Sequence, residues 1–273
     1  MPTRTGKKIG LALGGGAARG IAHIGVLEVL ERENIPIDVI AGTSAGALVG
    51  ALYAQGKKST EIKEIAQKLD WKKRLRLIDL ALPRMGFIGG RRLKELVNSI
   101  TGDIDFKDLK IPLSCVATDI VTGEEIVINE GSVLEAVRAS VSLPVIFAAV
   151  KRENRYLVDG GLVNQVPVSV ARQMGADIVI AVNVLPHLEQ RAAKLHKKEK
   201  SGKEKKPSLF DIITQTINIS SSRLLESSLS GADVIIEPVV PGGSGSDFSR
   251  FADYIRCGQE EATMALPQIQ KLL

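Results

Sequence analysis

Histidine, cysteine and aromatic residues are scarce in this chain of 273 residues. The three histidines are His23, His187 and His196, so few side chains are available for a serine–histidine–aspartate triad. The two cysteines lie far apart, and Cys115 sits in an apolar run where a small buried thiol is the ordinary explanation, which fits a reducing cytoplasm. Aromatic residues make up 4% of the chain and do not interleave with the basic segment, so nothing favours nucleic-acid binding.

A long apolar run is also missing. Residues 39–56 carry no charge, but four glycines together with Thr43, Ser44 and Gln55 lower the hydropathy of this stretch. A strand, a tight turn and a buried helix explain it better. We therefore predict that no segment spans a membrane.

The positive charge is confined to one segment. The net charge is +5, yet residues 191–206 hold eight Lys/Arg and two Glu, a sum of +6, so the remainder sums to −1. Low apolar content predicts an exposed flexible loop at 191–207. Two interpretations stay open: a solvated loop, or attraction to an anionic membrane surface, where each lysine contributes about 1 kcal/mol.

Short apolar runs alternate with helix-like segments along the chain, which is the pattern of a sheet covered by helices on both faces. We predict an α/β fold with three layers, α/β/α, and a mostly parallel central sheet. The predicted strands are 9–13, 38–41, 113–117, 125–128, 155–158 and 178–184. The predicted units are a catalytic domain at 9–190, the basic loop at 191–207 and a C-terminal helical extension at 208–273 packed on that domain. Residues 71–90 are either a cap over a site or a surface helix and loop.

The sharpest chemical signal is the run GTSAG at residues 42–46, which follows a predicted strand and opens a predicted helix. This is the context of a nucleophile elbow, in which Gly42 and Gly46 permit a strained turn and close helix–strand packing. Ser44 would then be presented at the end of the strand. The helix N-terminus places the Ala45 N–H where an oxyanion would form.

A second glycine-rich turn, GGGAARG at residues 14–20, also lies between a strand and a helix. Its backbone N–H groups can bind a phosphate or an oxyanion. A dinucleotide fingerprint would need glycine or alanine where Arg19 stands, and a Walker motif would need Lys and Ser/Thr after Gly20. Arg19 either holds the loop or adds positive charge near the site, or it forms a plain structural ion pair.

Because histidines are scarce, it is an open question which residue acts as the general base for Ser44. His187, at the end of a predicted strand, is the only plausible histidine. The alternative is Asp159 in VDGG, where Gly160 and Gly161 permit close backbone approach. The reference pKa of Asp is lower than that of His by roughly 2.6 units, but burial can raise a carboxyl pKa by roughly 3 to 5 units. A Ser44–Asp159 dyad is therefore physically workable.

Taken in order, GGGAARG, GTSAG and DGG resemble the oxyanion loop, nucleophile elbow and dyad aspartate of bacterial patatin-like phospholipases. The runs ATDIVTGEEIVINEG and ASVSLPVIF are also similar to that family, and the resemblance covers residues 9 to about 184. It implies a patatin-like fold with a Ser–Asp dyad, and hydrolysis of fatty acyl esters in phospholipids, lysophospholipids or neutral lipids, without a metal or cofactor. By the same resemblance, Gly14, Gly15 and Gly16 supply oxyanion N–H groups, and Arg19 falls at the family's basic loop position.

Two rival functions remain open at this point. One is an acyltransferase on the same scaffold, and the other is a catalytically inert protein that binds or regulates at lipid surfaces. We expect a cytoplasmic protein, with peripheral contact to the inner membrane face through the Lys-rich segment, and no nucleic-acid partner.

Overall fold

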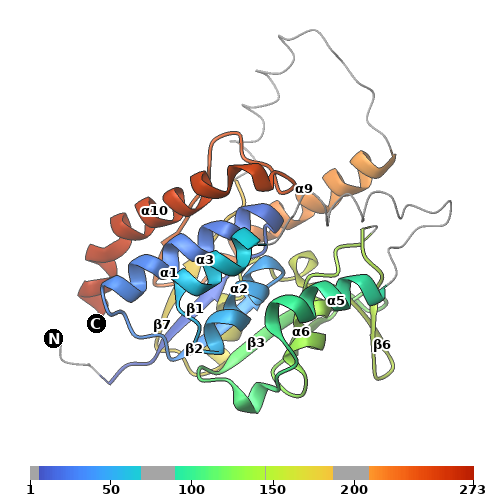
Figure 1. The fold of residues 1–273 in the computed structure, drawn as a ribbon, viewed down its shortest axis with the longest axis horizontal. Coiled ribbons are helices and arrows are strands. Elements are labelled where there is room, and N and C mark those ends of the chain that lie inside the picture. The colour runs from blue at the N-terminus through green and yellow to red at the C-terminus, as the bar shows by residue number, and fades with distance from the viewer. Residues whose placement is uncertain (1–5, 69–89, 145, 187–208) are drawn as a thin grey trace, which may run out of the picture.

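The computed structural model describes residues 6–68, 90–144, 146–186 and 209–273 (Figure 1). The predicted basic loop at 191–207 lies outside the described residues. So does the segment at 71–90, for which a cap and a surface helix and loop are the alternatives, except for Gly90. His187 and His196 lie outside them too.

The described residues form a mixed, eight-stranded sheet in the order β5-β6-β3-β2-β1-β7-β8, with β4 paired to β3. The strands are β1 (Ile9–Leu13), β2 (Val39–Thr43), β3 (Leu113–Asp119), β4 (Glu125–Ile128), β5 (Val150–Arg152), β6 (Arg155–Asp159), β7 (Ile178–Val182) and β8 (Val234–Ile236). Strands β8, β7, β1, β2 and β3 run parallel, whereas β4, β5 and β6 pair in antiparallel fashion. The prediction of a mostly parallel central sheet is confirmed.

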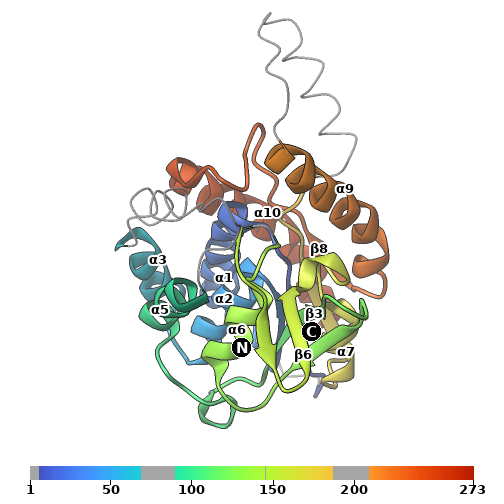
Figure 2. The ribbon, with the colours of Figure 1, turned by 90° about the vertical axis from the view of Figure 1, so that its right-hand side faces the viewer.

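Helices cover both faces of this sheet, as the alternating pattern predicted. They are α1 (Ala22–Arg32), α2 (Ala45–Ala54), α3 (Ser59–Lys68), α5 (Gly90–Thr101), α6 (Val133–Ser140), α7 (Val168–Gln173), α9 (Leu209–Leu229) and α10 (Phe251–Leu272). Short 3₁₀ turns occupy Ala17–Ile21, Phe106–Asp108, Gly160–Leu162 and Phe248–Arg250. Alternate residues of β1 show the layering: Leu11 and Leu13 belong to a buried cluster with residues of α1, α2, α6 and α10, and Ala12 belongs to a second cluster with residues of α7 and α9. Figure 2 shows α7 and α9 on one side of the sheet and α1 and α2 on the other.

The segment predicted as a C-terminal helical extension also supplies a strand. Besides α9 and α10 it contains β8, which pairs in parallel with β7 at one end of the sheet. A strand of three residues is too short to show an alternating pattern in the sequence. The tertiary pairing partner, which is not visible in the local sequence, makes them a strand.

Helix α10 packs directly along α1 (Figure 1). Two glycines allow this close approach, because a Cβ on Gly25 would overlap the carbonyl oxygen of Ile255, and one on Gly258 would overlap that of Ala22. Tyr254, on the same stretch of α10, is fully buried. The backbone contact at these glycines therefore sets the distance between the N-terminal and C-terminal parts of the chain.

We predict that Gly258→Ala destabilises the protein although alanine is the better helix former. Alanine gains about 1 kcal/mol in helix propensity, but overpacking a tight contact costs about 1–3 kcal/mol, and here the clash is with rigid backbone. Urea unfolding should show a net loss. Met264→Ala on the same helix, where the side chain is 66% exposed, is the matched control and should stay within about 0.5 kcal/mol of wild type. A more stable Gly258→Ala protein would contradict the close crossing.

Candidate active site

The sheet register brings residues 44 and 159 to the same level. Thr43 at the end of β2 pairs with Val116 of β3, and the next residue of β3, Ala117, pairs with Asp159 at the end of β6. Strand β6 runs antiparallel to β3, but it pairs only with residues 117–119 at the carboxyl-terminal end of β3 and stops there, so Asp159 lies at the level where β2 ends. Two strand spacings of about 4.8 Å each separate β2 from β6, which two inward-directed side chains can bridge.

Ser44 and Asp159 are in direct contact. The Ser44 hydroxyl donates to Asp159 Oδ2 at 2.5 Å. The other carboxylate oxygen accepts the Gly161 N–H at 2.8 Å, and the Asp159 carbonyl accepts the Thr118 hydroxyl at 2.9 Å. The structure thus brings together the two residues that the sequence singled out as nucleophile and base.

Burial raises the pKa of the Asp159 carboxyl group. The residue is 4% exposed, and desolvation raises its pKa to about 6, against the lowering effect of the hydrogen bonds from Ser44 and Gly161. A carboxylate with a pKa near the working pH combines the correct protonation state with useful proton-accepting power. Asp159 has both the geometry and the basicity to take the hydroxyl proton of Ser44.

The turn that presents Ser44 is strained, as an elbow requires. Ser44 has φ 53° and ψ −119°, in a region that non-glycine residues rarely adopt, and it lies directly before helix α2. The flanking glycines are sterically required: a Cβ on Gly42 would lie 2.6 Å from the Ala47 Cα, and one on Gly46 would overlap the Leu13 carbonyl oxygen. The nucleophile position therefore depends on close contact of α2 with the ends of β1 and β2.

The glycine-rich loop lies beside the nucleophile, since a Cβ on Gly15 would be 3.1 Å from the Ser44 Cβ. Two of its predicted oxyanion donors are engaged elsewhere: the Gly14 N–H donates to Val182 O at 3.0 Å, and the Gly15 N–H donates to Gln165 O at 3.1 Å. Their role is to anchor the loop. Within the part of the chain that the structure describes, no acceptor contacts the N–H of Gly16 or Ala45, so these two remain as candidate oxyanion donors.

Arg19 contacts the C-terminal part of the chain. Its guanidinium lies 3.5 Å from the Gly243 carbonyl oxygen, and the neighbouring Ala18 N–H donates to Gly245 O at 2.9 Å. Of the interpretations of Arg19, these contacts favour the one in which it holds the loop. Arg19 ties the glycine-rich loop to the segment at 241–247.

The glycines after the aspartate are also confined by close contacts. A Cβ on Gly160 would overlap the Val116 carbonyl oxygen, and one on Gly161 would lie 2.7 Å from Gln165 Oε1. Gln165 in turn donates from Nε2 to Gly15 O at 2.5 Å. The turn after Asp159 is thereby linked to the glycine-rich loop.

Three residues that support the site carried no readable signal for that role in the sequence. The Ser140 hydroxyl oxygen accepts the Ser44 N–H, and Gln165 links the turn after Asp159 to the glycine-rich loop. The fully buried His23 lies with its Nε2 2.8 Å from the Gly14 carbonyl oxygen. Burial lowers the pKa of His23 to about 4, so the ring is neutral and Nε2–H donates to the carbonyl. A lone buried serine or histidine has no pattern of its own, and only the fold shows its partner.

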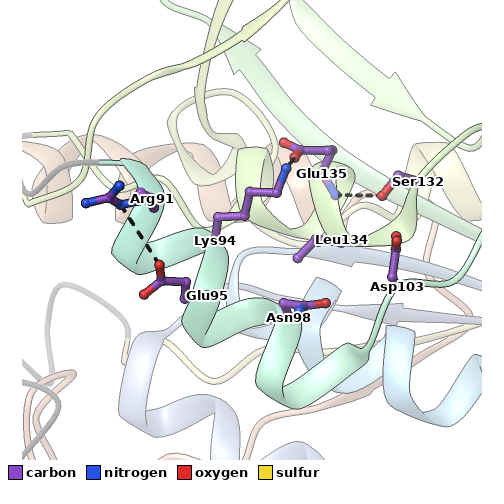
Figure 3. Close-up of a pocket in the computed structure, with 8 residues that line it drawn as sticks. All are labelled: Arg91, Lys94, Glu95, Asn98, Asp103, Ser132, Leu134 and Glu135. Atoms are coloured by element: carbon purple, nitrogen blue, oxygen red, sulfur yellow. Dashed lines mark hydrogen bonds and ion pairs between the residues drawn. The ribbon is translucent and has the colours of Figure 1, made fainter.

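An open cavity of about 460 Å³ lies away from the dyad, between α5 and the start of α6 (Figure 3). The Lys94 ammonium reaches across it to Glu135 at 2.6 Å. It is lined by Arg91, Lys94, Glu95, Asn98, Asp103, Ser132, Leu134 and Glu135. Neither dyad residue lines this cavity, so it is separate from the Ser44 site.

Two further searches of residues 6–68, 90–144, 146–186 and 209–273 gave negative results. No cluster of three or more His, Cys, Asp or Glu side chains there could hold a metal ion. No helix in these ranges combines the length and the apolar character needed to cross a bilayer.

Comparison with known proteins identifies relatives of the chain. The model of the family described as patatin-like phospholipase matches residues 11–172. Neuropathy target esterase sws of Drosophila melanogaster is 36% identical over 187 residues, which cover 66% of this chain and 13% of that protein. Human patatin-like phospholipase domain-containing protein 6 is also 36% identical over 187 residues, covering 66% and 14%.

A bacterial relative and a solved structure extend the comparison. An uncharacterised NTE family protein of Mycobacterium tuberculosis is 35% identical over 177 residues, covering 65% of this chain and 49% of that protein. The chain therefore spans less than half the length of each of these three relatives. The crystal structure of the type III effector protein ExoU shares the fold, with a TM-score of 0.50 at 14% identity over 96% of this chain and 53% of that one.

The raised pKa of Asp159 predicts how ester hydrolysis depends on pH. The base must be deprotonated, so kcat/KM should rise with pH through an apparent pKa of about 6 and level off above it. A pH series with a short p-nitrophenyl ester measures this profile. A plateau that extends unchanged down to about pH 4, near the reference pKa of an exposed Asp, would contradict a buried carboxylate base.

Proposed function

The chain belongs to the patatin-like phospholipase family, and from this premise we propose that it hydrolyses fatty acyl ester bonds of lipids with Ser44 as nucleophile and Asp159 as general base. The observation that carries the proposal is the 2.5 Å hydrogen bond between the Ser44 hydroxyl and the buried Asp159 carboxylate. An activated serine next to free backbone N–H groups is suited to acyl transfer. The lipid nature of the substrate is supported by the family.

In the proposed mechanism, Ser44 Oγ attacks the acyl carbon while its proton passes to Asp159. The N–H groups of Gly16 and Ala45 stabilise the resulting oxyanion. Collapse of this intermediate returns the proton from Asp159 to the leaving alkoxide and gives an acyl-enzyme. Water then attacks the acyl carbon, Asp159 accepts a proton from that water, and Ser44 Oγ leaves with the proton as the fatty acid is released.

The proposal includes where the protein acts. We propose lipid degradation in a bacterial cytoplasm. The mycobacterial relatives support the bacterial origin, and the two cysteines, which are both free thiols, fit a reducing compartment. The Lys-rich residues 191–206, with their net charge of +6, support peripheral contact with the anionic inner face of a membrane.

We predict that Ser44→Ala and Asp159→Asn each remove nearly all hydrolysis of a short p-nitrophenyl ester and leave the protein folded. Asparagine retains an oxygen for the Gly161 N–H but cannot accept the serine proton. Fluorophosphonate labelling should occur in wild type and be absent in Ser44→Ala. The control is His187→Ala: if it abolishes activity while Asp159→Asn remains active, the dyad is wrong, and a wild type that is not labelled would indicate an inert site.

A second prediction concerns the membrane contact. The triple substitution Lys197→Gln, Lys198→Gln, Lys200→Gln should weaken binding to anionic vesicles at low salt by up to about 3 kcal/mol, because each lysine contributes about 1 kcal/mol near such a surface. Vesicle co-sedimentation measures this, with purely zwitterionic vesicles as the control. Equal binding of both proteins to anionic vesicles would leave the segment as a solvated loop.

A further inference from the structure

We propose that Ser140 is a positioning residue for the nucleophile, an inference that rests on the proposed function of Ser44. Ser140 is the last residue of α6 and is completely buried. Its hydroxyl oxygen accepts the main-chain N–H of Ser44 at 2.8 Å, and its hydroxyl proton is donated to the Val116 carbonyl oxygen at 2.6 Å. One side chain thus joins the nucleophile to the neighbouring strand.

The direction of these two bonds is determined by chemistry. A carbonyl oxygen can only accept, so Val116 O takes the hydroxyl proton and leaves the lone pairs of Ser140 Oγ for the Ser44 N–H. Val116 is also the residue that pairs with Thr43, directly before the nucleophile. The hydroxyl therefore closes a small ring of contacts around the turn from β2 into α2.

This contact falls on the strained residue itself. A φ of 53° at Ser44 is a conformation that costs on the order of 1–3 kcal/mol and persists only when surrounding contacts hold it. The Ser140 hydroxyl is the acceptor that holds the amide of that residue. Without it, the peptide before Ser44 is free to rotate, and the distance from Ser44 Oγ to Asp159 Oδ2 lengthens.

The same end of α6 also contacts the base. The Asp159 N–H donates to the Ser142 carbonyl oxygen at 3.0 Å, so one helix end holds the main chain of both dyad residues. Ser140 is not a second nucleophile, because it has no exposed surface and its proton is engaged by Val116. Its contribution acts through the geometry of Ser44.

The test compares Ser140→Ala with wild type and with Ser59→Ala. Ser59 is a matched control, since it is a buried serine whose hydroxyl is bonded to Glu31 on α1, and neither residue contacts the dyad. For each protein, kcat and KM for a short p-nitrophenyl ester are measured, together with the rate and the end-point of fluorophosphonate labelling. The end-point of labelling measures the fraction of protein molecules that have a folded site, and the labelling rate measures the reactivity of Ser44.

We expect kcat and the labelling rate of Ser140→Ala to fall by about 10- to 100-fold, the scale of loss produced by small displacements of a reacting group. KM and the labelling end-point should be unchanged, because substrate contacts and folding are retained. Ser59→Ala should keep the wild-type kcat even where its unfolding temperature drops.

Three results would overturn the inference: a wild-type rate in Ser140→Ala, a loss of rate explained entirely by fewer labelled chains, or an equal loss in Ser59→Ala. Should Ser140→Ala not fold, Ser140→Cys takes its place, because sulfur is a weak acceptor, and a wild-type rate in that variant also overturns it. A wild type that is never labelled overturns the proposed function together with this inference. A labelled wild type with an equally fast Ser140 variant overturns the inference alone.

Discussion

The burial of one carboxylate, that of Asp159, is the constraint on which the rest of the site depends. Desolvation raises its pKa to about 6, which makes an aspartate basic enough to replace a histidine. The same burial lowers stability. The folded-state pKa lies above the unfolded value of about 3.9, so the folded protein binds this proton more tightly than the unfolded chain does. The protonated carboxyl therefore contributes its full stabilisation of the fold below about pH 4, and this contribution is lost as the pH rises through about 6. At neutral pH the difference amounts to roughly 3 kcal/mol, which the packed layers on both sides of the sheet must offset.

The order and register of the strands place the Asp159 carboxylate next to Ser44. A sheet that was parallel throughout would place both dyad residues at strand ends, but β6 runs the other way and still ends at the level of Ala117. Hydrogen bonds then occupy both carboxylate oxygens, one from Ser44 and one from Gly161. Because both oxygens have donors, the buried charge is stabilised by hydrogen bonds, and no cation among the described residues lowers its pKa.

How much of this could be predicted from the sequence differs between levels of structure. The layers follow from local patterns: the runs predicted as strands at 9–13 and 178–184 are short and apolar, and the structure has strands at Ile9–Leu13 and Ile178–Val182. The elbow could be predicted because the two glycines of GTSAG, which the strained turn requires, lie next to the serine in the sequence. Strand β8 was not readable, since three residues become a strand only by pairing with β7.

The oxyanion donors show the same limit within the site. Three consecutive glycines at 14–16 look equivalent in sequence, yet two of their N–H groups are taken by Val182 and Gln165, which lie about 150 residues or more further along the chain. Whether an amide is free is a property of the tertiary structure. The family match ends at residue 172, but Val182 anchors Gly14, and Gly245 accepts the Ala18 N–H. Since the glycine-rich loop is held by groups on both sides of that boundary, the unit that shapes the site extends past the matched segment to the residues before α10.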